Sequence, residues 1–242
     1  MPVLSTLKYS FSLLLVLCST IVVSAQATDT AIMVRKKPAE MKTGNQLRFT
    51  FDISKPIINA VAKNRQSYEL GIDYYLKKEV YLVAEGGFGK SDVDYPDLAY
   101  KSNGSFLRVG VDKSMLQRLF PKDWDGAFVG IRYGLGIIKR GEATYAVNDP
   151  LFGNTTGTIE AHNFTAHWAE ISGGVRVEVL KRFMVGWNVR AKFMLNASAF
   201  SELAPAYIAG YGKGDGSTAF DFNFNLCYMM RWGEKNLPAP GK

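Results

Sequence analysis

The stretch "FDFNFNLCYMMRW" (residues 220–232) alternates between bulky apolar and polar side chains. In an extended chain, Phe220, Phe222 and Phe224 lie on one face, whereas Asp221 and Asn223 lie on the other. This period of two is typical of a β-strand with one face in apolar and one in polar surroundings. Two folds accommodate such a strand. A soluble barrel of lipocalin type turns the apolar face inward, and a membrane barrel turns it outward to lipid.

The same alternation recurs along the chain and predicts about eight strands. The other segments are residues 47–53, 68–76, 80–88, 107–112, 129–137, 169–179 and 185–193. Their apolar faces carry no charged residue. This absence favours lipid contact, because an Arg or Lys facing the middle of a bilayer costs about 2–4 kcal/mol. An even strand number is also typical of bacterial membrane barrels.

Side-chain volume predicts which face is outside. The apolar face is rich in Phe, Trp, Tyr and Leu, whereas the opposite face combines charged residues with glycine. Because an eight-stranded barrel has a narrow interior, the glycine-containing face suits the lumen. The sequence therefore predicts an all-β fold, an eight-stranded antiparallel transmembrane β-barrel with up-and-down meander topology over residues 45–232. Aromatic girdles at the membrane interfaces are expected from Tyr68, Tyr74, Phe88, Tyr133, Trp168, Tyr228 and Trp232.

Closure of the barrel requires the first and last strands to pair. An open strand edge in hydrocarbon would leave backbone groups unpaired, at several kcal/mol each. We therefore expect residues 47–53 to pair with the strand in residues 220–232. Arg48 and Asp221 are expected to share the lumen near this seam.

The N-terminus has the features of a cleaved Sec-type signal peptide, residues 1–25. The basic residue Lys8 precedes an apolar run at residues 11–23, and small residues follow at the exit. Cleavage after Ala25 fits this pattern, with Ala27 as the alternative. Residues 26–44 are then expected to form a flexible periplasmic segment, and residues 233–242 a C-terminal tail. Cleavage also removes one of two cysteines, so the mature chain cannot contain an internal disulfide.

The charge of the chain is basic, with a formal net charge of +7. We attribute this excess to loops and turns that face anionic lipid headgroups, because an exported protein is not expected to bind nucleic acid. The connections between strands are unequal in length. Turns at residues 77–78 and 181–182 are short, whereas residues 89–104, 138–165 and 195–216 form long connections, and residues 55–66 are expected to hold a helical turn. If the N-terminus is periplasmic, the long loops lie outside the cell.

The polar faces supply the candidate functional residues. They are expected to form a structural ion-pair network in the lumen, because unpaired buried charges are costly; a narrow ion path is the alternative. The set comprises Arg48, Asp52, Glu69, Asp73, Glu85, Arg108, Asp112, Arg132, Glu170, Arg176, Glu178, Arg190, Lys192 and Asp221.

No catalytic, cofactor-binding or metal-binding residues are predicted. His162 and His167 lie near Glu160 and Glu170, but their spacing matches no ligand pattern. The stretch "GYGKGDG" (residues 210–216) lacks the helix and Ser/Thr pattern of a phosphate-binding loop. A mobile hairpin loop is expected there.

The mature chain resembles a family of uncharacterised outer-membrane β-barrel proteins from Bacteroidetes. The similarity is carried by stretches such as "FDISKPI" (residues 51–57), "SYELGIDYYL" (residues 67–76) and "AHWAEISGGVRVEVL" (residues 166–180). It implies a small porin-like, OmpA-like barrel in the bacterial outer membrane and no particular activity. One departure is that Trp232 is followed by "GEKNLPAPGK", whereas many barrels end on an aromatic residue that the assembly machinery recognises.

These features together predict an integral outer-membrane barrel with a charged, plugged lumen and a structural or surface-interaction role. The expected partners are outer-membrane lipid and the barrel-assembly machinery. A narrow channel is the alternative function, and an outer-membrane enzyme or a soluble lipocalin-like binder fits the sequence less well. The sequence identifies no ligand for the outer loops.

Overall fold

The computed structural model describes residues 45–62, 64–116, 124–149, 153–200 and 203–232. The expected signal peptide, the segment 26–44 and the tail 233–242 lie outside the described residues. Among the described residues, no helix is both long and apolar enough to cross a membrane.

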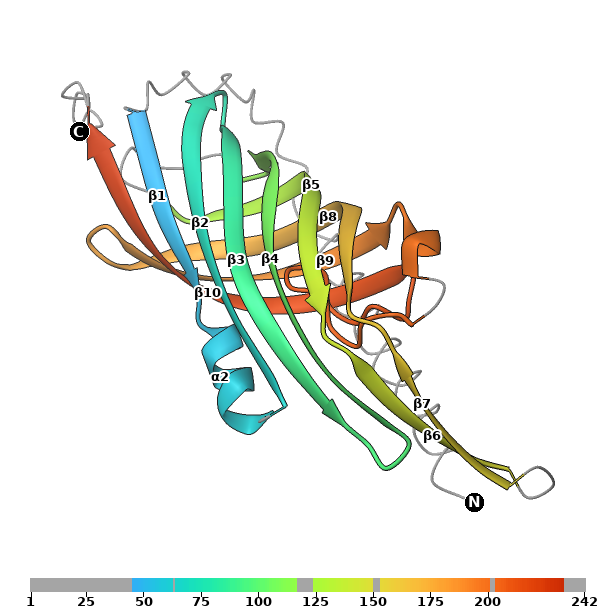
Figure 1. Cartoon of the computed structure of the whole chain (residues 1–242). Helices are drawn as coiled ribbons and strands as arrows, with labels where there is room; N and C mark the ends of the chain where they lie inside the picture. The colour runs from blue at the N-terminus through green and yellow to red at the C-terminus, as the bar shows by residue number, and fades with distance from the viewer. Residues whose placement is uncertain (1–44, 63, 117–123, 150–152, 201–202, 233–242) are drawn as a thin grey trace, which may run out of the picture. The chain divides into compact units, whose positions relative to one another are not determined.

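Eight antiparallel strands close into a barrel (Figure 1). They are β1 (Asn45–Asp52), β2 (Arg65–Lys77), β3 (Val80–Asp94), β4 (Leu98–Ser114), β5 (Gly126–Arg140), β8 (His162–Leu180), β9 (Phe183–Met194) and β10 (Thr218–Trp232). Each strand pairs with its neighbours in chain order, and β1 pairs with β10 through Phe49 opposite Tyr228 and Asp52 opposite Asn225. The predicted eight-stranded meander, including its closure between first and last strands, is confirmed.

Two connections at one end of the barrel are tight. Lys78 and Glu79 join β2 to β3 with φ values of 50° and 60°, which suit a two-residue hairpin turn because they match the twist of the flanking strands. Arg182, between β8 and β9, has a φ of 73°. We call this the short-turn end. The opposite end, the loop end, carries helix α2 (Ser54–Val61), the short 3₁₀ helix η1 (Ala197–Phe200) and the longer connections. The helical turn expected in residues 55–66 is present.

Two of the expected long loops are mostly strand. β3 continues to Asp94 and β4 already begins at Leu98, so that the connection between them is a tight turn. Within residues 138–165, strands β6 (Ala143–Asp149) and β7 (Gly153–Ile159) form a hairpin (Figure 1). β6 of this hairpin pairs with the first two residues of β4, Leu98 and Ala99. Backbone pairing thus continues past the last strongly apolar outward positions, where side-chain alternation no longer signals a strand.

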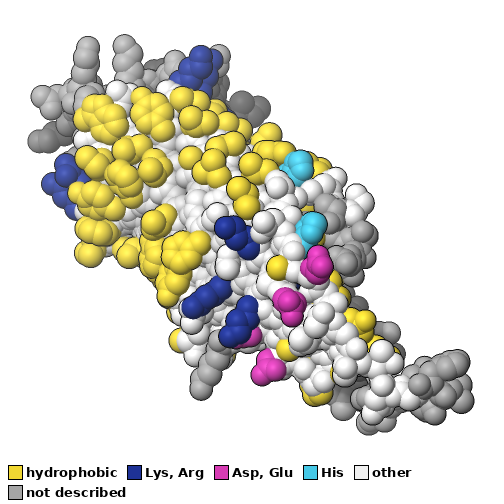
Figure 2. All heavy atoms as spheres, viewed as in Figure 1, with side chains coloured by type: hydrophobic (Ala, Val, Ile, Leu, Met, Phe, Trp, Pro, Cys, Tyr) yellow, Lys and Arg dark blue, Asp and Glu magenta, His cyan; other side chains and the backbone are white. Residues whose placement is uncertain are grey.

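The facing of the strands is that of a membrane barrel. Outward residues such as Leu70 and Ile131 have exposed fractions of 63% and 61%, whereas the inward residues Arg108 and Asn223 have 0%. Figure 2 shows hydrophobic side chains gathered over a broad area, with charged groups beyond it toward the β6–β7 hairpin. A lipocalin-like binder would require the opposite facing, so that alternative is wrong.

Replacing Phe224 with arginine tests this facing. Phe224 is exposed on β10 and packs against Phe222, with ring centroids 5.0 Å apart. Phe224→Arg should destabilise the folded barrel by about 2–4 kcal/mol if the side chain faces the middle of the bilayer. Folding into lipid vesicles, followed by heat-modifiable gel mobility and urea titration, measures the loss. Phe224→Leu is the control and should fold normally; equal stability of the two variants would contradict the assignment.

Candidate functional site: the charged lumen

The polar residues predicted for the lumen come from all eight barrel strands, and all but two are buried. The exceptions are Glu178 and Asp221, whose side chains are 16% and 23% exposed. Glu178 lies near the short-turn end and pairs with Arg231, whereas Asp221 lies in the loop-end half. The inward faces of the strands thus form a continuous polar interior.

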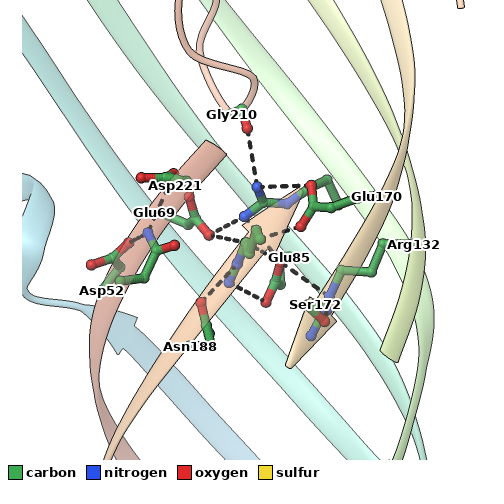
Figure 3. Close-up of polar contacts among 12 residues, drawn as sticks. Asp52, Glu69, Glu85, Arg132, Glu170, Ser172, Asn188, Gly210 and Asp221 are labelled. Carbon is green, nitrogen blue, oxygen red and sulfur yellow. Dashed lines mark hydrogen bonds and ion pairs between the residues drawn. The ribbon is translucent and has the colours of Figure 1, made fainter. Parts of the chain in front are cut away.

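Glu85 occupies the centre of this interior (Figure 3). Its Oε2 lies 3.0 Å from Arg108 Nη2, 3.0 Å from Arg190 Nη1 and 3.5 Å from Arg132 Nε. Glu69 contacts both Arg108 and Arg190, and its Oε1 lies 3.0 Å from Arg190 Nη1. Three guanidinium groups from β4, β5 and β9 therefore share carboxylates from β2 and β3, which ties distant parts of the barrel wall together.

The third carboxylate of this cluster, Glu170, contacts Arg108 and Arg190 and is also bound by an aromatic residue. Trp168 was expected in a membrane girdle, but it is fully buried, and its Nε1 donates a hydrogen bond to Glu170 Oε2 at 3.2 Å. The indole lies over Gly134 of β5, where an added Cβ would come within 2.2 Å of the ring. Glycine on the inner face of β5 thus provides the space for Trp168.

The network continues toward the short-turn end. Arg176 Nη1 lies 3.0 Å from Asp73 Oδ2, and its Nη2 lies 3.3 Å from Asp112 Oδ2. Arg132 Nη2 reaches Asp112 Oδ1 at 3.0 Å, which links this part to the central cluster. Arg48 donates to Tyr81 Oη at 2.8 Å, with its guanidinium 4.0 Å from the ring centroid.

Toward the loop end, the network includes Lys55, which was not among the residues predicted for the lumen. Lys55 extends from α2 to Asp221, with 2.7 Å between Nζ and Oδ2, and Lys192 reaches the same oxygen at 3.0 Å. Lys55 lies outside the strands, so no alternation marked it, although it follows Asp52 by three residues. Burial tends to lower the pKa of Lys55, but Asp221, Glu69 and Asp52 outweigh it and raise that pKa above its usual value.

The expected proximity of Arg48 and Asp221 is wrong. On β10, Arg48 lies opposite Met229, whereas Asp221 lies beyond the end of the β1–β10 pairing and opposite Arg190 of β9. The two charges therefore occupy different halves of the lumen. Side-chain alternation predicted the face of the barrel wall that the two residues share, whereas their positions along the barrel axis are set by the pairing register.

The connection between β9 and β10 folds back into the loop end of the barrel. Tyr207, Ile208, Ala209 and Tyr211 of this segment are buried. The carbonyl oxygen of Gly210 accepts hydrogen bonds from Arg108 Nη1 at 3.1 Å and Lys192 Nζ at 2.9 Å. Figure 3 shows Gly210 directed toward the cluster that contains Glu85 and Glu170. Part of the stretch expected to be a mobile hairpin is therefore an inner plug, which we define as residues 207–211.

Gly210 is required at the tip of the inner plug for two reasons. Its φ of +79° lies in the left-handed region that favours glycine, and an added Cβ would come within 2.5 Å of the Phe106 ring. Phe106, Trp168 and Tyr211 belong to one buried apolar cluster, so the plug covers the charged network with an apolar layer.

The charges of the described lumen network balance. Its basic members are Arg48, Lys55, Arg108, Arg132, Arg176, Arg190 and Lys192, and its acidic members are Asp52, Glu69, Asp73, Glu85, Asp112, Glu170 and Asp221. Within this network, seven basic groups thus face seven acidic groups. A further buried arginine, Arg140, lies at the loop end and donates hydrogen bonds to the carbonyl oxygens of Leu203 and Glu160. Balance is needed because an uncompensated buried charge is strongly destabilising.

The two histidines lie apart from this network. His167 Nδ1 is hydrogen-bonded to Tyr133 Oη at 2.9 Å on the outer side of β5 and β8, whereas Glu170 points into the lumen. His162 is exposed at the start of β8. The arrangement therefore does not bring His167 and Glu170 together. Within the described part of the chain, no cluster of three or more His, Cys, Asp or Glu residues is placed to hold a metal ion.

The fold and its charged lumen define the class as a closed eight-stranded barrel of the outer-membrane type. Residues 6–234 match the model of a family described as a domain of unknown function, DUF6048, and the chain belongs to this family. No curated protein matches the sequence. Among solved structures, the chain is similar to Neisserial surface protein A at 9% identity and a TM-score of 0.38, covering 78% of this chain and 96% of that chain. The Bacteroidetes origin stays a prediction.

Neutralising Glu85 tests whether charge balance stabilises the barrel. Glu85→Gln leaves Arg108, Arg132 and Arg190 with one carboxylate fewer, and we expect a loss of about 3–5 kcal/mol in the free energy of unfolding. Urea titration of the protein in lipid vesicles provides the measurement. Glu178→Gln, at the partly exposed Arg231 pair, makes the same chemical change and should cost no more than about 1 kcal/mol. Equal losses would show that enclosure of the central cluster does not matter.

Proposed function

We propose that the protein is an integral outer-membrane barrel with a closed lumen and a structural or surface-interaction role. The observation that carries this proposal is the distribution of side chains between the two faces of the barrel wall. Apolar residues cover the outside, and charged residues in balanced pairs fill the inside.

Placement in the outer membrane is supported by the outer surface and by the expected signal peptide. Phe222, Trp187 and Phe183 are among many large apolar side chains that remain more than two-fifths exposed. Exposed apolar surface on this scale is unfavourable in water, but it is the expected surface in lipid. Closure of β1 onto β10 also pairs the strand edges, which a barrel in hydrocarbon requires.

A closed lumen is supported by the way its groups are used. The guanidinium of Arg190 is engaged by Glu69, Glu85 and Glu170, so that an ion passing the centre would have to displace strong mutual contacts. The inner plug covers the loop-end side of the same cluster. These contacts support a stabilising role for the network rather than conduction, and the narrow channel becomes the alternative that an experiment must exclude.

A surface-interaction role is supported by the loop end. The β6–β7 hairpin extends the sheet, and β7 is its edge strand. Thr155, Thr156 and Thr158 are exposed on this strand. An edge strand presents unpaired backbone groups that can pair with another extended segment. This end therefore offers both backbone and hydroxyl groups to a partner outside the cell.

Electrical recording tests the closed lumen. The full mature protein, incorporated into a planar lipid bilayer, should produce no unitary conductance steps, because the balanced network and the plug fill the lumen. A general porin recorded in parallel confirms that the bilayer and voltage protocol detect open barrels. Reproducible steps that disappear or change size in Arg190→Gln would instead assign conduction to this lumen.

Cysteine labelling tests the orientation. Thr156→Cys places a thiol on the exposed β7 strand, and Lys181→Cys places one at the exposed β8–β9 turn. A membrane-impermeant maleimide should label Thr156→Cys on intact cells and Lys181→Cys only after lysis. The native Cys227 is buried and serves as the unlabelled background. The reverse labelling order would place the β6–β7 hairpin in the periplasm.

A further inference from the structure

A groove lies on the outer surface of the barrel across β2, β3, β4 and β5. It is bounded by two parallel rows of outward side chains near the loop end of the apolar surface. The groove is lined by Gln66, Tyr68, Phe88, Lys90, Asn103, Ser105, Ile137 and Lys139, together with backbone of Gly89 and Gly104.

The row nearer the loop end is polar and basic. Strand register places Lys90 directly opposite Gln66 and Asn103, and places Asn103 directly opposite Lys139. All four side chains are exposed. Neighbouring strands are about 5 Å apart, so that the two lysine stems flank one amide at a spacing of about 10 Å. Both flexible ammonium groups can reach a single group bound over Asn103.

These two lysines differ from the lysine in the next row. Lys101 pairs with Asp92 at 3.0 Å between Nζ and Oδ2. Among the described residues, by contrast, neither Lys90 nor Lys139 has an acidic partner within ion-pair distance. Two uncompensated ammonium groups therefore face outward at one height, which makes the row complementary to an anion.

The second row is apolar except at its centre. Tyr68 and Phe88 pack together with ring centroids 5.3 Å apart on one side, and Ile137 lies on the other. Ser105 lies between Phe88 and Ile137 in the register, and its short side chain leaves the hollow of the groove. A ligand bound to the lysines would thus meet an apolar channel leading toward the membrane interior.

We propose that this groove binds the phosphate-bearing headgroup of a membrane lipid. Lys90 and Lys139 would pair with the phosphate, Asn103 would donate a hydrogen bond between them, and an acyl chain would lie over Ser105. The inference rests on the proposed membrane placement. The adjoining apolar row favours a lipid over free phosphate or an acidic peptide, because neither of those would use the channel beside Phe88 and Ile137.

Native mass spectrometry of the full mature protein in detergent tests the proposal. Phosphatidic acid and diacylglycerol with identical acyl chains differ only in the phosphate, and inorganic phosphate supplies the anion without the chains. The wild-type protein should bind phosphatidic acid at least about tenfold more tightly than diacylglycerol, a difference of about 1.4 kcal/mol, and should retain no inorganic phosphate at the same concentration.

Four variants locate the binding. The double variant Lys90→Gln/Lys139→Gln should lose the preference for phosphatidic acid. Ser105→Phe fills the hollow while it preserves an apolar outer face, and it should weaken binding although both lysines remain. The control Lys101→Gln removes one positive charge from the neighbouring row and should bind as the wild type does. Phe224→Leu changes an outward residue of β10, a strand that does not line the groove, and should also leave binding unchanged.

Four results would overturn the proposal. They are unchanged binding in the double variant, an equal loss in Lys101→Gln, equal retention of phosphatidic acid and diacylglycerol, and retention of inorganic phosphate alone. The last result would assign the lysines to a free anion. Heat-modifiable mobility of every variant is recorded in parallel, so that failure to form the barrel is distinguished from failure to bind lipid.

Discussion

Compensation of charge inside a barrel only eight strands wide is the constraint on which the structure depends. The apolar faces of the strands turn outward, which leaves the polar faces to meet one another in a narrow space. Glu85 illustrates the solution, since it lies within ion-pair distance of Arg108, Arg132 and Arg190. Every strand contributes to such contacts, so the network fixes the relative heights of strands that are not neighbours in the wall.

The remaining interior follows from the same lack of space. The large indole of Trp168 fits beside Glu170 only because Gly134 has no side chain. The inner plug then offers its Gly210 carbonyl to Arg108 and Lys192, which leaves fewer donors without acceptors at the loop end. The inner plug therefore has two functions. It packs apolar side chains over the charged network, and it accepts hydrogen bonds from that network.

The sequence was sufficient to predict the facing of the strands, their number and the closure of the barrel, because side-chain parity is a local property. Trp168 lies on the same face of its strand as Glu170, so side-chain alternation also predicts a position in the lumen. Its place near a strand end instead suggested a membrane girdle. The inner contacts of Gly210 and Lys55 could not be predicted, because they arise where loops fold back on the finished barrel. Strand extension through residues 89–104 depends on backbone pairing rather than on a repeating apolar pattern.

A double-mutant cycle between Glu85 and Arg190 tests the central claim most directly. The free energy of unfolding in lipid vesicles is measured for the wild type, Glu85→Gln, Arg190→Gln and the double variant. If balanced charge stabilises the lumen, the double variant is less destabilised than the sum of the single variants, with a coupling of about 0.5–3 kcal/mol. Additive losses, with no coupling between two groups 3.0 Å apart, would contradict the account.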